Sequence, residues 1–333
     1  MKKFNLYILL PLFSMLFVAC GDNLSNYTDA QKDTSITILT ELIRKYPNES
    51  DNFYKRSLLF IKQKKANEAL KDIEKAIALD STKAPYYLVL CDVNIMQIQT
   101  RKSKIALEKC LQLDPKNVEA HLKMAELYLY VGQNKTSIEH IDKALQINKY
   151  NAKAYFIKGM NFKEMRDTIN SLSSFQTCVE QDPEYFRAYV ELGSLESDRK
   201  NPIALSYYQT ALKLNPKSLE VYYAIGMHFQ NNNEIDKAME SYQTILQLDS
   251  TYKNALYNLG YIYLNEKEEI NKAQYYFNKA ILADDNYAEA YYMRGLCYEA
   301  LKNNKLAQQD YTQALKRKED FELAYEGLQR LKK

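Results

Sequence analysis

The sequence repeats itself with a period of about 34 residues. Pro47, Pro115 and Pro183 are evenly spaced, and each lies two such periods after the one before. Five glycines follow the same period to within one residue: Gly159, Gly193, Gly226, Gly260 and Gly295. A repeat of this length is typical of chains in which every unit forms the same small motif and buries its apolar faces against its neighbours. We therefore expect an array of stacked units.

Each unit contains two apolar stripes with helical spacing, separated by a short polar turn. In residues 219–252 the turn is NNNE, and the two stripes are Tyr222, Ile225, Gly226 and Phe229, then Ala238, Tyr242 and Ile245. Two amphipathic helices joined by a short turn form a helical hairpin. The chain has only 8 Gly and 7 Pro in 333 residues, too few turn-forming residues for a mostly β protein. These observations predict an all-α fold.

The units resemble the tetratricopeptide repeat (TPR), a helical hairpin of about 34 residues with large and small residues at set positions. Eight units follow its pattern, beginning at Ser50, Ala84, Val118, Ala152, Phe186, Leu219, Lys253 and Ala288. Position 20, where two helices approach closely, is small in every unit: Ala69, Ser103, Ser137, Ser171, Ala204, Ala238, Ala273 and Ala307. Departures from the pattern include Arg56 and Arg294 at position 7, usually Leu, and Asn94 at position 11, usually aromatic. The resemblance implies a right-handed solenoid of eight hairpins over residues 50–321.

A capping helix is expected at each end of the array. Residues 34–49 have the pattern of a lone second helix, with Ser35, Leu39 and Leu42 at its packing positions. Residues 322–333 are expected to form a terminal helix with a polar outer face, made of Glu322, Glu326, Gln329 and Lys332. Solenoids need such a face on the last unit to remain soluble.

The N-terminus has the features of an export leader. Lys2 and Lys3 precede an apolar stretch, residues 6–19, that is too short to span a bilayer comfortably. The stretch ends in LFVAC, residues 16–20, and resembles the leader of bacterial lipoproteins, which is cut before a cysteine that is then acylated. The resemblance implies a signal peptide over 1–19 and a lipidated Cys20, held stably in the membrane by three acyl chains.

Residues 20–33 are expected to form the lipidated cysteine and a polar tether. Gly21 after the cysteine favours the outer membrane under the sorting rule of some double-membrane bacteria. Two alternatives stay open: a secreted protein with an incidental Cys20, or a single uncleaved anchor helix.

No catalytic, metal or cofactor site is predicted. The three histidines, His121, His140 and His228, have no metal-ligand spacing. The segment GQNKTS at 132–137 lacks the second glycine of a phosphate loop and lies in a hairpin turn, and residues 284–286 lack the spaced carboxylates of a calcium loop. We expect both segments to be structural.

The cysteines inside the repeats are expected to fill tight packing positions. Cys91 lies at position 8, and Cys110 and Cys178 lie at position 27; Cys297 also falls within a repeat. Cys91 and Cys110 belong to one hairpin, so in an exported protein they could form a disulfide, and free buried thiols are the alternative.

The resemblance places a partner-binding groove on the concave face, which the first helix of each unit lines. Position 5 is apolar or aromatic in all eight units, and position 9 adds further large residues. The predicted groove contains Tyr54, Leu88, Leu122, Phe156, Met160, Tyr223, Met227, Tyr257, Tyr261, Tyr292 and Leu296. Tyr and Met are enriched at the centres of interfaces. The alternative is that position 5 only seals neighbouring helices.

Tyr257 and Tyr261 do not lie at packing positions, so truncating either is expected to leave the fold nearly intact. The residues by which some TPR domains clamp a C-terminal carboxylate are not matched, because Tyr54, Leu58 and Val89 occupy the corresponding places.

The sequence therefore predicts a protein that binds other proteins and is not an enzyme. The repeats occupy nearly the whole chain and leave no room for a catalytic domain. After residue 19 the chain has 43 basic and 42 acidic residues, so binding to nucleic acid is not expected. The prediction is a lipid-anchored scaffold for peptide or protein partners. A passive surface lipoprotein and an enzyme with an unrecognised site are the alternatives.

Overall fold

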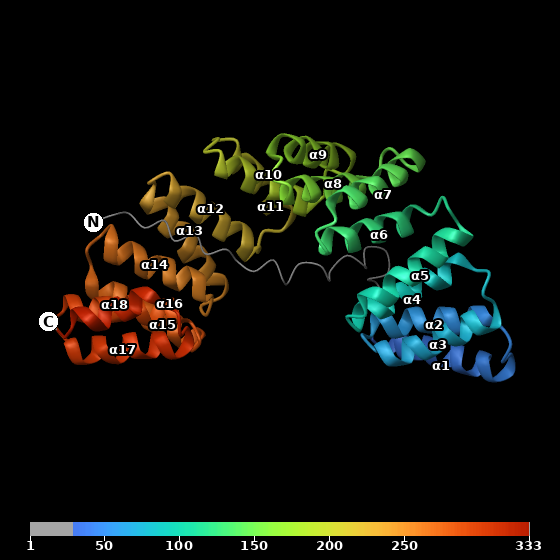
Figure 1. The fold of residues 1–333 in the computed structure, drawn as a ribbon, viewed down its shortest axis with the longest axis horizontal. Helices are drawn as coiled ribbons and strands as arrows, with labels where there is room; N and C mark the ends of the chain where they lie inside the picture. The colour runs from blue at the N-terminus through green and yellow to red at the C-terminus, as the bar shows by residue number, and fades with distance from the viewer. Residues whose placement is uncertain (1–28, 333) are drawn as a thin grey trace. The chain divides into compact units, whose positions relative to one another are not determined.

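The computed structural model describes residues 29–332, and all regular secondary structure in that part of the chain is α-helical (Figure 1). In chain order the helices are α1 (Asp29–Lys45), α2 (Ser50–Lys62), α3 (Ala66–Leu79), α4 (Ala84–Met96), α5 (Thr100–Leu113), α6 (Val118–Tyr130), α7 (Asn134–Ile147), α8 (Ala152–Glu164), α9 (Thr168–Gln181), α10 (Phe186–Asp198), α11 (Ala204–Leu214), α12 (Leu219–Asn231), α13 (Ile235–Leu248), α14 (Lys253–Asn265), α15 (Ile270–Ala283), α16 (Ala288–Ala300), α17 (Asn304–Arg317) and α18 (Glu322–Arg330). The predicted all-α solenoid fold is confirmed. The predicted signal peptide and Cys20 lie outside the described residues.

The even-numbered helices from α2 to α16 begin at the eight residues that the repeat spacing predicts as the first of each unit. Each pairs with the helix that follows it to form a hairpin. The first capping helix lies nearer the N-terminus than the predicted range 34–49, because α1 begins at Asp29 and ends at Lys45. Residues 30–32, Ala-Gln-Lys, have high helix propensity and extend the helix into the segment expected to be a tether.

Seven of the eight hairpin turns have the same backbone geometry, and the turn after α14 is one residue longer, with the amide of Glu269 donating to the carbonyl of Tyr263. After α2, the amide of Lys64 donates to the carbonyl of Ile61 and the amide of Lys65 donates to the carbonyl of Phe60, both at 2.9 Å. This pattern is the Schellman motif, which ends a helix with one left-handed residue. The left-handed residues of the eight turns are Lys64, Ile98, Gly132, Arg166, Lys200, Asn233, Glu268 and Lys302. The turn therefore forms without glycine in seven of these eight repeats.

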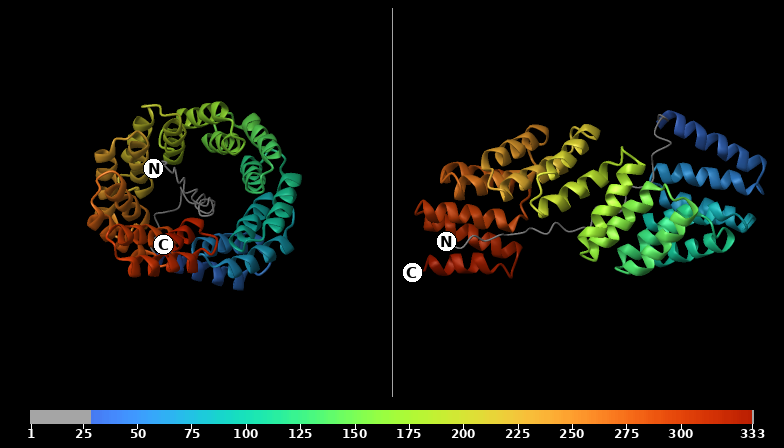
Figure 2. Two further views of the ribbon diagram at one scale, coloured as in Figure 1. Left: turned by 60° about the vertical axis from the view of Figure 1, so that its left-hand side comes forward. Right: turned by 90° about the horizontal axis from the view of Figure 1, so that it is seen from above.

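The described helices belong to two compact units, which we treat separately. The first unit contains α1 to α7 and ends at Asn148, and the second runs from Lys149 and contains α8 to α18. Within the second unit α10 contacts α12 and α14 contacts α16, and within the first unit α2 contacts α4. The first helices of successive hairpins therefore lie side by side on one face of each unit, and the second helices form the other layer (Figure 2).

The two arginines that depart from the TPR pattern form equivalent ion pairs. Arg56 donates two hydrogen bonds to Asp72 at 2.6 and 2.7 Å, and Arg294 donates two to Asp310 at 2.8 Å. The helix before each hairpin supplies a third acceptor, the hydroxyl of Thr40 or the amide oxygen of Asn278. The bidentate pairing satisfies carboxylates that are almost fully buried. An arginine can therefore replace the usual leucine in the first and the last repeat.

The four cysteines of the repeats are free thiols in the structure, and all are buried. Burial raises the pKa of Cys91 to about 12 and that of Cys110 to about 11, so both thiols are protonated at neutral pH. Cys91 and Cys110 therefore do not form a disulfide in this structure. In the described part of the chain, no helix combines the length and the apolarity needed to cross a membrane.

Candidate functional site

The candidate site is the face that the first helices line, which we call the first-helix face. In the second unit it is built by α8, α10, α12, α14 and α16, and the predicted groove residues of repeats 4 to 8 all lie on these helices. Side chains four residues apart point to the same side of a helix, so positions 5 and 9 of each repeat share this face.

The aromatic residues at position 5 pack into three-ring clusters. Tyr257 contacts Phe277 with ring centroids 5.6 Å apart and Tyr287 at 5.2 Å. The same arrangement recurs around three other residues, with partners Phe175 and Tyr185 for Phe156, Tyr242 and Tyr252 for Tyr223, and Tyr311 and Phe321 for Tyr292. Each ring at position 5 therefore seals its own hairpin against the start of the next repeat.

Sequence reasoning missed the third member of each cluster. Tyr185, Tyr252, Tyr287 and Phe321 each stand immediately before the first helix of the next repeat. To within one residue, successive members are separated by one or two repeat periods, and this regular spacing was the signal that could have identified them. Aromatic residues in contact at these distances stabilise a fold beyond the effect of their buried area.

Burial divides the predicted groove residues into two groups. Leu122, Phe156 and Tyr257 are buried, with Tyr257 only 6% exposed, and cannot contact a partner without rearrangement. The expectation that truncating Tyr257 would spare the fold is therefore wrong, because its ring fills a core cluster. The remaining eight are half-exposed: Tyr54, Leu88, Met160, Tyr223, Met227, Tyr261, Tyr292 and Leu296.

An asparagine connects the half-exposed residues of α12 and α14. The side-chain amide of Asn258 donates to the hydroxyl of Tyr223 at 3.3 Å and lies 3.4 Å from the sulfur of Met227. Burial raises the pKa of Tyr223, and its hydroxyl remains a neutral hydrogen-bonding group at physiological pH. The face at this point presents apolar surface with a hydroxyl and an amide, and no charged side chain takes part in the cluster. This combination can hold an extended peptide by apolar contact and by hydrogen bonds to its backbone.

Charged residues gather on the α8, α10 and α12 part of the same face. Lys163 pairs with Glu191 at 2.5 Å, and Arg187 lies over the ring of Phe156 at 5.2 Å. Glu220 and Asp198 are exposed to water, yet the surrounding protein removes part of their hydration and raises the pKa of both carboxyl groups. Of the two ends of this face, the one formed by α12, α14 and α16 is the less charged.

The first unit has a different, more polar face. Tyr54 stacks on Tyr86 with ring centroids 4.9 Å apart, and Asp51 accepts hydrogen bonds from the hydroxyl of Tyr86 at 2.5 Å and from Lys83 at 2.8 Å. The bonds from Lys83 and Tyr86 lower the pKa of the Asp51 carboxyl group. The polar groups of this face thus pair with each other.

The structure brings two of the three histidines together, which the sequence did not indicate. The Nδ1 atoms of His121 and His140 are 3.1 Å apart, and Nε2 of His121 lies 3.0 Å from the carbonyl oxygen of Pro115. A carbonyl only accepts, so His121 carries its proton on Nε2, and its Nδ1 accepts from the Nδ1–H of His140. Burial, followed by the neighbouring His121 and Lys143, lowers the pKa of His140 to about 4. The pair is therefore neutral at physiological pH.

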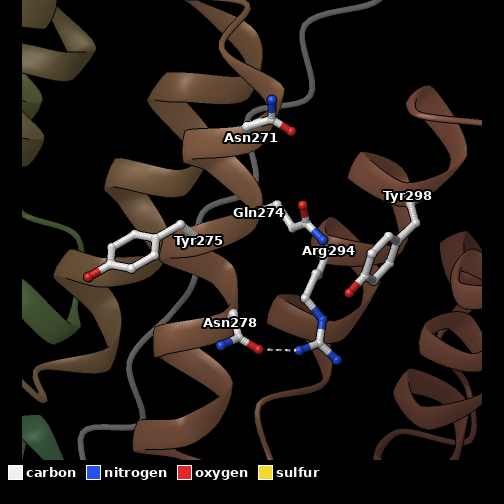
Figure 3. Close-up of a pocket in the computed structure, with 6 residues that line it drawn as sticks. All are labelled: Asn271, Gln274, Tyr275, Asn278, Arg294 and Tyr298. Atoms are coloured by element: carbon white, nitrogen blue, oxygen red, sulfur yellow. Dashed lines mark hydrogen bonds between the residues drawn. The ribbon is translucent and has the colours of Figure 1, made fainter. Parts of the chain in front are cut away.

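A pocket of about 240 Å³ lies between α15 and α16, away from the groove residues (Figure 3). Its lining residues are Asn271, Gln274, Tyr275, Asn278, Arg294 and Tyr298. Figure 3 shows the ring of Tyr275 directed away from Arg294, whose guanidinium group is bonded to Asn278. Because Asp310 holds the other side of that guanidinium group, Arg294 acts here as a structural residue.

Family models and solved structures match the repeat pattern. Two models described as tetratricopeptide repeat match residues 50–83 and 106–139. A model of the middle TPR-like domain of cilia and flagella-associated protein 70 matches residues 189–319. The chain resembles a solved tetratricopeptide repeat protein from Parabacteroides merdae, with a TM-score of 0.56 at 14% identity over 75% of this chain and 99% of that one. It also resembles the APC/C hetero-tetramer Cut9-Hcn1, with a TM-score of 0.54 at 16% identity over 91% of this chain and 59% of that one.

Curated relatives match about a third of the chain. A UDP-N-acetylglucosamine–peptide N-acetylglucosaminyltransferase of Giardia intestinalis is 28% identical over 112 residues, 33% of this chain and 7% of the relative. The general transcriptional corepressor ssn6 of Schizosaccharomyces pombe is 29% identical over 121 residues, 36% of this chain and 11% of the relative. The match thus spans about a tenth of the length of these proteins and is confined to a segment of each.

The fold and the first-helix face define a class of protein, the helical repeat solenoids built from stacked hairpins. Within that class, the repeat period and the matching family models show that this chain is built of tetratricopeptide repeats. Folds of this kind bind protein or peptide partners and are typically not catalytic.

Proposed function

We propose that this protein is a non-catalytic scaffold that binds an extended peptide or a protein segment on the first-helix face of its second unit. The observation that carries the proposal is a half-exposed surface of uncharged side chains on α12, α14 and α16, Tyr223, Met227, Tyr261 and Leu296, with the buried amide of Asn258 among them. Side chains of these types supply contact area at interface centres, and a buried amide supplies direction. The typically non-catalytic character of the fold supports a binding role.

The proposal also places the protein on a membrane. The basic, apolar leader and the LFVAC sequence support acylation of Cys20 and attachment to the bacterial envelope, in the outer membrane. If Cys20 is acylated, Cys20→Ser leaves an unprocessed or soluble form. Partitioning of wild type and variant into a detergent phase tests this, and identical partitioning would refute acylation.

The binding face is tested with a displayed peptide library and matched variants. Peptides enriched on the purified chain are measured by fluorescence anisotropy against wild type and against Tyr261→Ala with Leu296→Ala. Both side chains are half-exposed at the border of the core cluster, so their loss weakens binding at least about tenfold, and affinity is measured at a temperature where every variant is folded. The control is Tyr275→Ala, an exposed tyrosine of a second helix, which leaves affinity unchanged. Equal loss of affinity in control and test variants would refute this binding face.

A further inference from the structure

The hairpin turns of the first unit carry a concentration of positive charge that the overall charge balance conceals. The three turns, residues 62–68, 96–102 and 130–136, contain one acidic residue, Glu68, and six basic residues: Lys62, Lys64, Lys65, Arg101, Lys102 and Lys135. All six basic side chains are exposed. We call these three turns the turn edge of the first unit.

The turns form one edge because the repeats stack in register. The side-chain amide of Gln97 in the second turn donates to the side-chain oxygen of Asn67 in the first turn at 3.0 Å. Between the second and third hairpins, the ammonium group of Lys104 lies over the ring of Tyr128 at 5.4 Å. The first two turns are therefore in contact, and the contact between α5 and α6 sets the third turn beside the second hairpin.

Large apolar side chains are exposed among these charges. Ile98 is 79% exposed, and Tyr130 and Val131 are each 52% exposed. Ile98 also has a φ of 58°, in the left-handed region that a β-branched residue rarely adopts. An isoleucine here is unfavourable both for the backbone and for hydration, and strain of this kind is found at sites of function.

The turns of the second unit differ in charge. Residues 164–170, 198–204, 231–237, 265–272 and 300–306 contain eight basic and eight acidic residues. Several of these charges are paired, as in Lys237 with Glu234 at 2.6 Å and Lys267 with Asp236 at 2.7 Å. In the first unit, Lys64, Lys65, Arg101, Lys102 and Lys135 have no ion pair within the described residues. Exposed apolar residues and unpaired basic residues occur in the turns of both units, but only in the first unit do basic residues greatly outnumber acidic ones across the turns.

We infer that the turn edge of the first unit docks on an anionic phospholipid surface. The unpaired lysines and arginine face phosphate-bearing headgroups, and the side chains of Ile98 and Val131 enter the boundary between headgroups and acyl chains. Nucleic acid fits less well, because aliphatic side chains at the tips of the turns can neither stack on bases nor read their edges. This contact goes beyond the proposed function, since it requires neither acylation of Cys20 nor an occupied first-helix face.

The test uses the chain from Gly21 to Lys333, which contains every described helix and lacks the apolar leader. Its binding to vesicles of phosphatidylcholine alone is compared by co-sedimentation with binding to vesicles that also contain about 30% phosphatidylglycerol. We expect binding to the anionic vesicles only, and its loss when salt rises from about 0.1 M to about 1 M. Equal binding to both vesicle types, or no binding, overturns the inference.

Matched variants locate the contact. Changing Lys64, Lys65, Arg101 and Lys102 together to Gln is expected to weaken vesicle binding at least about tenfold, since each basic residue close to an anionic surface contributes several-fold. The control changes Arg166, Lys200, Lys302 and Lys305, exposed basic residues in the turns of the second unit, to Gln and leaves binding unchanged. Equal loss of binding in both variants overturns the inference.

Ile98→Gly removes the apolar side chain without destabilising the turn, because glycine adopts the left-handed backbone more easily than isoleucine. We expect weaker vesicle binding, by about threefold, with a melting temperature equal to or above that of wild type. A duplex DNA competitor is added in a final arm. If DNA displaces the protein from vesicles and binds it more tightly, the edge is a nucleic-acid site and the inference is wrong.

Discussion

The two units solve the same packing problem with different pairs of side chains. In each hairpin, position 8 of the first helix faces position 24 of the second helix. At these two positions the first unit has Ser57, Cys91 and Ala125, followed in the second helices by Ile73, Leu107 and Ile141. The second unit pairs Gly159, Gly193, Gly226, Gly260 and Gly295 with Phe175, Tyr208, Tyr242, Phe277 and Tyr311. A small side chain at position 8 thus occurs with an aliphatic residue at position 24, and a glycine at position 8 occurs with an aromatic residue.

The difference shows that the two residues together fill a similar volume between the helices of each hairpin, although the residue at each position changes. At Gly226, a Cβ atom would lie 2.5 Å from a ring carbon of Tyr242, closer than real contacts allow, and each of the other four glycines would bring a Cβ within 2.8 Å of its ring. Both versions exclude water, because Ile73, Leu107 and Ile141 are as fully buried as the rings of the second unit. Tight packing at constant volume is what protein interiors require.

The largest expected effect comes from breaking this pairing in the second unit. Gly226→Ala forces the Tyr242 ring to move within a filled core and is expected to destabilise the protein by about 3 kcal/mol. Combining it with Tyr242→Ile recreates the Ala125 and Ile141 pair of the first unit. The double variant should be no less stable than Tyr242→Ile alone, and a double-mutant cycle by urea unfolding measures the coupling.

Gly132→Ala is the matched control, since a Cβ there would meet no atom within 4 Å. Its cost, about 1 kcal/mol, comes only from the left-handed backbone at a φ of 71°. Additive effects of Gly226→Ala and Tyr242→Ile would contradict the volume argument.

A smaller loss of stability is expected when the pH is lowered. It should be larger in the first unit, which contains the His121–His140 pair. The pKa of His140 falls from an ordinary value near 6.5 to about 4 in the folded first unit. The unfolded chain therefore binds more protons as the pH falls from 6.5 towards 4, so stability present above pH 6.5 is lost over that interval. Partial exposure of His140 reduces the effect to about 2 kcal/mol.

Hydrogen exchange at pH 7 and at pH 4.5 measures this loss in α6 and α7. The exchange rates at each pH are divided into the intrinsic rates for that pH, so that protection factors are compared. In the second unit, His228 bonds to Ser197 and Asn232 and has no histidine neighbour among its bonded partners. Burial also lowers the pKa of His228, so α12 is expected to lose protection in the same direction but to a lesser extent. His140→Phe should remove most of the acid sensitivity of α7. Equal acid sensitivity of wild type and variant would assign the effect to other groups.

The smallest effect concerns the turns. Ile98→Gly in the first unit is expected to raise the free energy of unfolding by about 0.5 kcal/mol, because relief of the left-handed strain exceeds the entropy that glycine adds to the unfolded chain. Lys200→Gly in the second unit should change stability by less, since an unbranched side chain tolerates the same backbone better. Thermal melts of both variants decide the matter, and a larger gain at Lys200 would contradict this account of the turns.

Much of the architecture could be read from residue spacing. The first helices begin at the predicted residues because the start of a repeat is a local property of turn and stripe. The N-terminal capping helix was less predictable. Its first turn, residues 29–32, has no apolar stripe, so only helix propensity indicates that it is helical. The partner-binding role of the groove residues remains a prediction.

The sequence by itself determined the period, the helical hairpins and the small residues that let helices approach, since each follows from neighbours within one unit. Only the tertiary structure decided which groove residues are accessible. Tyr257 and Tyr261 are the same residue type one helical turn apart, yet Tyr257 is covered by Phe277 of α15 and by Tyr287, the residue before α16. Burial depends on atoms that packing brings together across a hairpin, and contacts of the same kind let Asp72 and Asp310 accommodate arginines where the repeat pattern has leucine.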